Sequence, residues 1–120
     1  MMTAQLDELA ALDFCYLTTT GRVSGMAHTI EIWFALDGRT LYMLAGAGEN
    51  ADWVKNARRK SAVFIRISDE MFAGTARIVT VPDEDALARR LVVGKYQPRE
   101  DDDLSGWGRT ALPVAVDRML

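Results

Sequence analysis

The sequence predicts an α+β fold, in which a small, mostly antiparallel barrel of about six strands is combined with short helices. Short β-branched and aromatic segments recur at hairpin spacing, at residues 14–20, 28–35, 40–45, 62–67, 71–81 and 111–116. A helical pattern is inserted at residues 50–60, and another follows Pro82. Neither a linker nor a repeat divides the chain, so we expect residues 1–120 to form a single domain.

The amino-terminal third predicts one helix and three strands. Leucine and alanine recur at near-helical spacing over residues 3–12. Aromatic and β-branched residues then predict a strand over residues 14–20, and residues 28–35 alternate as a second strand. Asp37-Gly38 predicts a tight hairpin leading to a third strand over residues 40–45. We therefore expect three antiparallel strands joined by short turns.

The middle of the chain predicts a helix and a second hairpin. Asn50 is a suitable N-cap, and the residues on the buried side of the helix are Trp53, Val54 and Ala57. Residues 62–67 are almost continuously apolar, which is typical of a buried strand. Residues 71–81 run back as its partner until Pro82 ends the strand.

The carboxyl-terminal part predicts a helix, a loop and a last strand. Acidic residues follow Pro82 in the first helical turn, and the residues that we expect to point inward are Leu87, Leu91 and Val92. Residues 99–108 hold four acids and two glycines, which indicates a loop. The strand over residues 111–116 contains Pro113, which favours an edge position because proline cannot donate to a sheet.

Composition excludes several classes of function. The net charge of −3 and the pI of about 5.1 argue against a nucleic-acid partner, and the one basic run, Arg58-Arg59-Lys60, suits a helix end. No apolar run approaches the ~20 residues of a membrane helix, and residues 1–8 lack the features of a signal peptide. A single cysteine, Cys15, and a single histidine give neither an internal disulfide nor an ordinary zinc site. We expect a cytoplasmic protein.

The glycine loop after the first predicted strand is the strongest candidate site. Gly21 and Gly25 allow the backbone to bend sharply, so that several N–H groups can face one anion. Arg22 adds a planar set of donors suited to phosphate or carboxylate. Local chemistry leaves a plain hairpin turn with a solvated arginine as an equal alternative.

A second glycine-rich bend, at residues 46–49, leads directly into the predicted helix at residue 50. The amino terminus of a helix attracts anions and carbonyl oxygens. An ordinary link between strand and helix is the alternative that the spacing alone favours.

Several motifs together resemble a known family. The stretch Tyr16-Leu-Thr-Thr-Thr-Gly-Arg-Val-Ser-Gly25 is similar to its Leu-Thr-Thr-Thr-Gly-Arg-x-Ser/Thr-Gly signature. Ala45-Gly-Ala-Gly48, Asp52-Trp-Val-Lys-Asn56 and the closing Gly108-Arg-Thr-Ala-Leu-Pro-Val114 follow in the same order. On these motifs, residues 14–116 resemble the deazaflavin-dependent nitroreductases and quinone reductases of the flavin-binding split-barrel superfamily.

The resemblance implies a split barrel that moves a hydride between reduced coenzyme F420 and a small quinone-like or nitroaromatic acceptor. It also implies that two chains can pair as a homodimer. Tyr96 falls where the family often has an aromatic residue facing substrate, so it is the candidate proton donor, although it could equally cap its helix. The residues that the resemblance assigns to the cofactor are Thr20, Arg22, Ser24, Gly25, His28, Ala45, Gly46, Ala47, Gly48, Trp53 and Asn56.

Three positions depart from the family pattern and keep alternatives open. Val23, His28 and Ala47 stand where basic residues are common in the family. Each missing cation removes a charge-assisted contact worth about 1.5–3 kcal/mol. FMN in place of F420, or a barrel that binds a small ligand without catalysis, are therefore the alternative functions. By residue type alone, Trp53 is first a core residue and His28 first a strand-end residue bonded to backbone.

Overall fold

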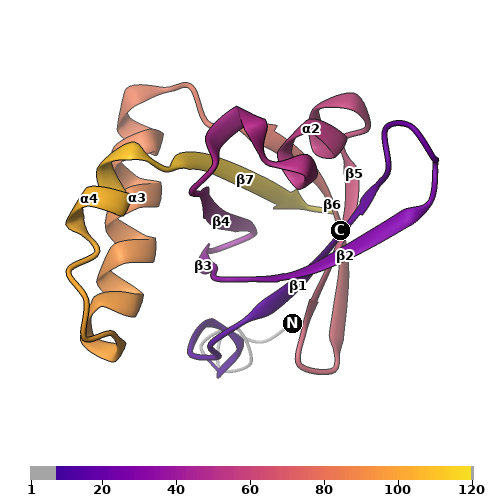
Figure 1. The fold of residues 1–120 in the computed structure, drawn as a ribbon. Helices are drawn as coiled ribbons and strands as arrows, with labels where there is room; N and C mark the ends of the chain where they lie inside the picture. Colours follow the sequence, from indigo (N-terminus) through magenta and orange to yellow (C-terminus); the bar gives the residue numbers. More distant parts are fainter. Residues whose placement is uncertain (1–7, 120) are drawn as a thin grey trace.

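A computed structural model describes residues 8–119, and it contains a sheet of seven antiparallel strands with helices on two sides (Figure 1). The strands are β1 (Cys15–Thr20), β2 (Ala27–Ile32), β3 (Ala35–Asp37), β4 (Thr40–Ala45), β5 (Ala62–Ile67), β6 (Glu70–Ile78) and β7 (Leu112–Arg118). The α-helices are α2 (Asp52–Arg59), α3 (Pro82–Tyr96) and α4 (Ser105–Thr110), and the short 3₁₀ helices are η1 (Gly48–Asn50) and η2 (Gln97–Arg99).

The order of the strands forces the sheet to curl. The order is β2-β1-β5-β6-β7-β4-β3, so β2 and β3 form its two edges. These edge strands are consecutive in the chain, and only Trp33 and Phe34 separate them. Two residues span too short a distance to cross a flat sheet of this width. The sheet therefore bends until its edges approach each other, which gives a half-barrel.

The concave side of the half-barrel holds the main core. Alternate residues of β1 point inward, as the buried positions Cys15, Leu17 and Thr19 show. The register places Leu17 opposite both Ile30 and Ile65. Helix α2 closes one opening of this core with Val54 and Ala57, which are both buried. The helix thereby lies directly beside the end of β1.

A second core lies outside the sheet, beneath α3 and α4 (Figure 1). Helix α3 packs Ala88, Val92 and Tyr96 against the outer faces of β3, β4 and β7. Leu87 and Leu91 are half-buried in the same cluster, so the predicted inward face of this helix is confirmed. Within residues 8–119, no helix lies over the outer face of β1, β5 and β6 (Figure 1).

The predicted number of strands was too low because one segment divides in two. Residues 28–35 form most of β2 and the first residue of β3 rather than one strand, which raises the count from six to seven. The break occurs at Phe34, whose backbone N–H donates to the Tyr96 hydroxyl at 3.0 Å. A backbone held by a helix residue cannot continue the β1 ladder, although the alternation of side chains persists through the break.

The edge position predicted for Pro113 is wrong. Strand β7 pairs with both β4 and β6, so it lies inside the sheet. Paired residues on β6 end at Ile78, opposite Val114, and the Pro113 carbonyl accepts a hydrogen bond from the Val79 N–H at 3.1 Å. The proline is tolerated because it stands near the start of its strand, beyond the ladder with β6.

Two further local predictions are corrected. Residues 105–110 form α4 rather than a loop, because Gly108 allows α4 to approach α3: a Cβ there would lie 2.6 Å from Val93 Cγ2. Asn50 is not an N-cap, since it belongs to η1 and α2 begins two residues later, after Ala51. Gly48, with a φ of +62°, starts the tight turn that displaces the helix start.

The helix predicted over residues 3–12 lies largely outside the described residues. Within them, residues 8–10 are helical, and Leu9 is buried in the main core. Between residues 8 and 119, none of the helices has the length and apolarity to cross a bilayer.

Candidate functional site

The loop between β1 and β2 forms a compact turn that is closed by its own backbone. The Gly21 N–H donates to the Met26 carbonyl at 2.7 Å, and the Gly25 N–H donates to the Gly21 carbonyl at 2.9 Å. Gly25 has a φ of +73°, which favours glycine. Gly21 is buried, and a Cβ there would lie 2.6 Å from Ser24 Oγ and 2.7 Å from His28 Nε2. The predicted glycine turn is therefore confirmed, and it holds Ser24 and His28 against Gly21.

Arg22 connects this loop to α2. Its Nη1 donates to Asn56 Oδ1 at 2.8 Å, and its backbone N–H donates to the same oxygen at 3.1 Å. Its Nη2 forms a salt bridge with Asp52 Oδ1 at 3.2 Å. The side chain of Arg22 is one-third exposed and that of Asp52 is 85 % exposed. The arginine is thus neither freely solvated nor wholly available to a ligand.

Asn56 is the buried polar residue on which this connection depends. The residue is 5 % exposed, and its Nδ2 donates to Thr19 Oγ1 at 3.4 Å. Thr19 is itself buried on the inner side of β1. Both ends of the Asn56 amide therefore have partners, which a buried amide requires. Asn56 thereby ties the loop after β1 to α2.

A cleft of about 530 Å³ lies beside the loop and α2. Five of the predicted cofactor residues line this cleft: Arg22, Ser24, His28, Trp53 and Asn56. Thr19, Gly21, Val23, Thr29, Ile30 and Asp52 complete the lining. The volume falls within the range of about 300–1,000 Å³ that small-molecule sites occupy.

The remaining predicted cofactor residues do not line this cleft. Thr20 and Gly25 belong to the same hairpin but lie outside the lining set. In the second bend, Ala45 is buried, whereas Gly46 and Ala47 are exposed and Gly48 is half-buried. A Cβ on Gly46 would lie 3.3 Å from Trp107 Nε1, so this bend faces the indole of α4.

Tyr96 is positioned for packing rather than for contact with the cleft. It is 2 % exposed, and its ring stacks on Trp33 with centroids 4.3 Å apart. Its hydroxyl accepts the Phe34 N–H at 3.0 Å and lies 2.8 Å from the Asp13 carbonyl. Burial raises the pKa of Tyr96 to about 12. This geometry favours a structural role at the β2–β3 break.

The thiol of Cys15 has no features of a nucleophile. The residue is fully buried on the inner face of β1, and burial raises its pKa to about 12. A thiolate is the reactive form of cysteine. Cys15 therefore acts as a small core residue, as its place in the strand pattern predicts.

Some residues of the cleft were not predicted from the sequence. Asp52 is the ion-pair partner of Arg22, a role that its place in the motif Asp52-Trp-Val-Lys-Asn56 does not indicate. Thr29 and Ile30 come from the far strand of the hairpin. Alternation along β2 could have indicated Ile30, because it shares its face with His28. The Arg22–Asp52 pair had no sequence signal, since the two residues are 30 positions apart.

Chemically, the cleft combines polar side chains with an apolar wall. Arg22, Ser24 and His28 supply the polar groups, and Ser24 Oγ lies 3.5 Å from His28 Nε2. Ile30 and the half-buried Trp53 supply the apolar surface. Such a site suits a flat organic group that carries a negatively charged substituent. No described residue near it forms an acid–base pair for bond cleavage, so the cleft suits binding and orientation.

The comparison with protein families gives one match that spans nearly the whole chain. Residues 3–119 match the model of a family described as F420H2-dependent quinone reductase.

Solved structures with the same fold share little sequence with this chain. An F420-H2 dependent reductase (FDR-A) is 20 % identical with a TM-score of 0.70, over 88 % of this chain and 96 % of that one. A 5-nitroimidazole antibiotic resistance protein from Bacteroides thetaiotaomicron, so described provisionally, is 15 % identical with a TM-score of 0.74, over 99 % and 81 %. A pyridoxamine 5′-phosphate oxidase from Listeria innocua, also a provisional description, is 16 % identical with a TM-score of 0.71, over 98 % and 92 %.

Proposed function

Because this chain belongs to the family of F420H2-dependent quinone reductases, we propose that it is an oxidoreductase that uses reduced F420 to reduce a small organic acceptor. The acceptor is quinone-like or nitroaromatic. The observation that carries the proposal is the cleft beside the first hairpin, whose lining includes the hydrogen-bonding side chains of Arg22, Ser24 and His28. A cofactor with a phosphate-bearing tail needs such donors.

The residues of the cleft fit part of such a cofactor. Arg22 and Ser24 supply donors for an anionic group, and the close packing over Gly21 keeps Ser24 and His28 in place. Trp53 and Ile30 offer apolar surface to a flat ring. The exposed bend at Gly46 and Ala47 precedes α2 in the chain, and we propose that it extends the site beyond the cleft.

When bound, a deazaflavin supplies the hydride, so the protein needs no nucleophile or metal of its own for that step. Arg22 and Ser24 hold the anionic end, Asn56 keeps Arg22 against α2, and Trp53 limits water at the ring. Catalysis then depends on alignment. Single substitutions are expected to act through binding more than through loss of one chemical group.

Titration of the purified chain with F420 and with FMN tests this function. We expect F420 to bind, with an affinity that falls as salt rises because the contacts are ionic. Arg22→Gln should weaken binding by about tenfold or more, since a charge-assisted bond contributes about 1.5–3 kcal/mol. The neighbouring Arg59→Gln, on the exposed side of α2, is the matched control and should change nothing. Absence of F420 binding, at low and at high salt, contradicts the proposal.

FMN binding and binding of a small ligand without redox chemistry are the two competing functions. The second is favoured by the loop itself: Val23 is 94 % exposed where a cation is common in the family, and Asp52 already pairs with Arg22. Preference for FMN in the same titration supports the first alternative. A protein that binds neither cofactor supports the second.

We also propose that two chains pair through the outer face of β1, β5 and β6. Phe64 and Met71 on this face are 53 % and 60 % exposed in the described part of the chain. Thr18, Phe64 and Ala73 lie side by side across the three strands in the register.

Light scattering after gel filtration tests this pairing and should give twice the mass of one chain. Phe64→Glu should then shift the protein to the single-chain mass, whereas Phe72→Leu, a change on the inner side of β6, should leave the assembly intact.

A further inference from the structure

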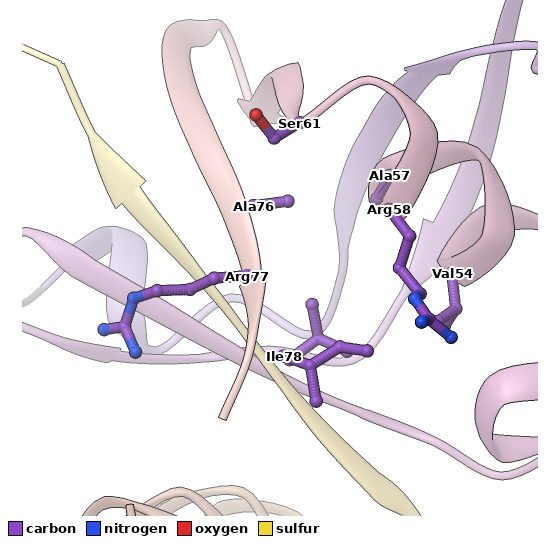
Figure 2. Close-up of a pocket in the computed structure, with 8 residues that line it drawn as sticks. Val54, Ala57, Arg58, Ser61, Ala76, Arg77 and Ile78 are labelled. Carbon is purple, nitrogen blue, oxygen red and sulfur yellow. The ribbon is translucent and has the colours of Figure 1, made fainter. Parts of the chain in front are cut away.

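A second cavity, of about 240 Å³, lies beside α2 (Figure 2). The residues of α2 that line it are on a different face of the helix from those that line the loop cleft. Asp52, Trp53 and Asn56 of α2 line the cleft, whereas Val54, Ala57 and Arg58 line the cavity. The two hollows share a helix but none of their lining residues. This cavity is therefore a separate site from the one proposed for the cofactor.

The walls of the cavity are apolar because small and branched aliphatic residues meet there. Val54 and Ala57 come from α2, Ala76 and Ile78 from β6, and Val114 from β7. Ala57 of α2 and Ala76 of β6 lie on opposite walls of the cavity (Figure 2). Short side chains at these positions leave space that a leucine or phenylalanine would fill.

The rim of the cavity is polar and carries one available cation. Arg58 is 56 % exposed, and its partner Glu49, at 3.5 Å, is 65 % exposed, so the pair is weak. Ser61 also lines the cavity, but its hydroxyl oxygen points away from the Arg58 guanidinium (Figure 2). Arg77 also borders the cavity, but its guanidinium points away from it and is held by Glu84 and Asp117 at 2.6 and 2.7 Å.

We infer that this cavity binds a small monocarboxylate with an apolar body, such as an aromatic acid of one ring. The carboxylate pairs with the Arg58 guanidinium, and the ring lies against Val54, Ile78 and Val114. An apolar cavity of about 150 Å³ is large enough for benzene, so 240 Å³ leaves room for a substituted ring. The cavity is smaller than sites for drug-sized ligands, which begin near 300 Å³. It is therefore too small for a whole flavin-type cofactor, and the inference stands independently of the proposed function.

Titration with benzoate, followed by methyl NMR, tests the inference on the intact chain. Signals of Val54, Ile78 and Val114 should move in a saturable manner. Benzamide, which has the same shape without the charge, should bind at least tenfold more weakly. Acetate, which has the charge without the ring, should also bind at least tenfold more weakly.

Variants locate the binding. Arg58→Gln should weaken benzoate binding about tenfold, whereas Arg59→Gln, the next arginine on the same helix but outside the lining, should leave it unchanged. Ala57→Leu, which fills the cavity, should abolish binding, and Arg22→Gln should not affect it. Equal loss in Arg58→Gln and Arg59→Gln, loss confined to Arg22→Gln, or no saturation by the wild-type chain would each overturn the inference.

Discussion

The Asn56 side-chain oxygen accepts two hydrogen bonds from Arg22, one from the backbone N–H at 3.1 Å and one from the guanidinium at 2.8 Å. A single amide on α2 thus fixes both the backbone and the side chain of the loop after β1. The same amide reaches Thr19 on the strand that leads into the loop. The shape of the candidate cofactor cleft therefore depends on one buried residue of a helix that lies far along the chain.

Asn56→Ala is expected to lower stability and to loosen the loop. Removing the amide leaves the Arg22 N–H without its partner, which costs about 1–3 kcal/mol. Chemical denaturation measures the loss, and F420 titration of the folded variant should show weakened binding. Asn50→Ala is the control, because Asn50 is exposed in η1. Equal stability of the two variants would contradict the role assigned to Asn56.

Asp52→Asn is expected to strengthen the binding of an anionic cofactor. The Asp52 carboxylate forms an exposed salt bridge with Arg22 and competes for the donors that a phosphate would use. Exposed pairs contribute about 0.2–1 kcal/mol, so the gain should be about two- to fivefold. Asp83→Asn, which removes the same charge from the first turn of α3, is the control. If both variants gain equally, the effect comes from net charge and not from release of Arg22.

Gly21→Ala is expected to disrupt the loop. The added Cβ would meet Ser24 Oγ and His28 Nε2 at 2.6 and 2.7 Å, so both side chains must move. Overpacking of this kind typically costs about 1–3 kcal/mol. Thermal unfolding measures it. Gly94→Ala in α3, where a Cβ meets nothing within 4 Å, should instead raise stability by about 0.5–1 kcal/mol.

Tyr96→Phe separates a structural role from a catalytic one. The hydroxyl accepts the Phe34 N–H and is buried, so its removal should cost about 1–3 kcal/mol of stability. Turnover per folded molecule should stay at the wild-type level, because the ring lies in the outer core. A stable variant that has lost turnover would instead support the proton-donor role implied by the family resemblance.

The ion cluster around Arg77 should make stability fall in acid. Hydrogen bonds from Arg77 hold the pKa values of Glu84 and Asp117 below their ordinary values of 4.5 and 3.8. A carboxylate with a lowered folded-state pKa stabilises the fold fully above its ordinary pKa. That contribution disappears as the pH falls through the folded pKa.

Arg77→Gln tests this dependence. The variant should be less stable than the wild type at pH 7, and the difference should shrink below about pH 4 as the carboxylates become protonated. Denaturation midpoints between pH 2 and 7 measure it. Arg90→Gln, an exposed change on α3, serves as the control. A stability difference that is independent of pH would argue against coupling to the two carboxylates.

The sequence alone determined the kind of fold and the glycine turn beside which the candidate cleft lies. Period-two alternation and hairpin residues predict β1, β4, β5 and most of β6, because these patterns depend on neighbours within a few residues. The glycine loop could likewise be predicted, since Gly21 and Gly25 are needed by the turn itself. Arg22, Ser24, His28, Trp53 and Asn56 line one cleft, and their role in holding a cofactor stays a prediction.

Only the tertiary structure decided which strands pair and which donors are free. The break at Phe34 depends on the Tyr96 hydroxyl, and the interior position of Pro113 depends on where β6 ends; neither has a local signal. The same holds for Asp52, whose carboxylate accepts a hydrogen bond from the Arg22 guanidinium although the two residues are 30 positions apart. Local pattern encodes local conformation, whereas contacts between distant residues are fixed only when the sheet curls and brings α2 against β1.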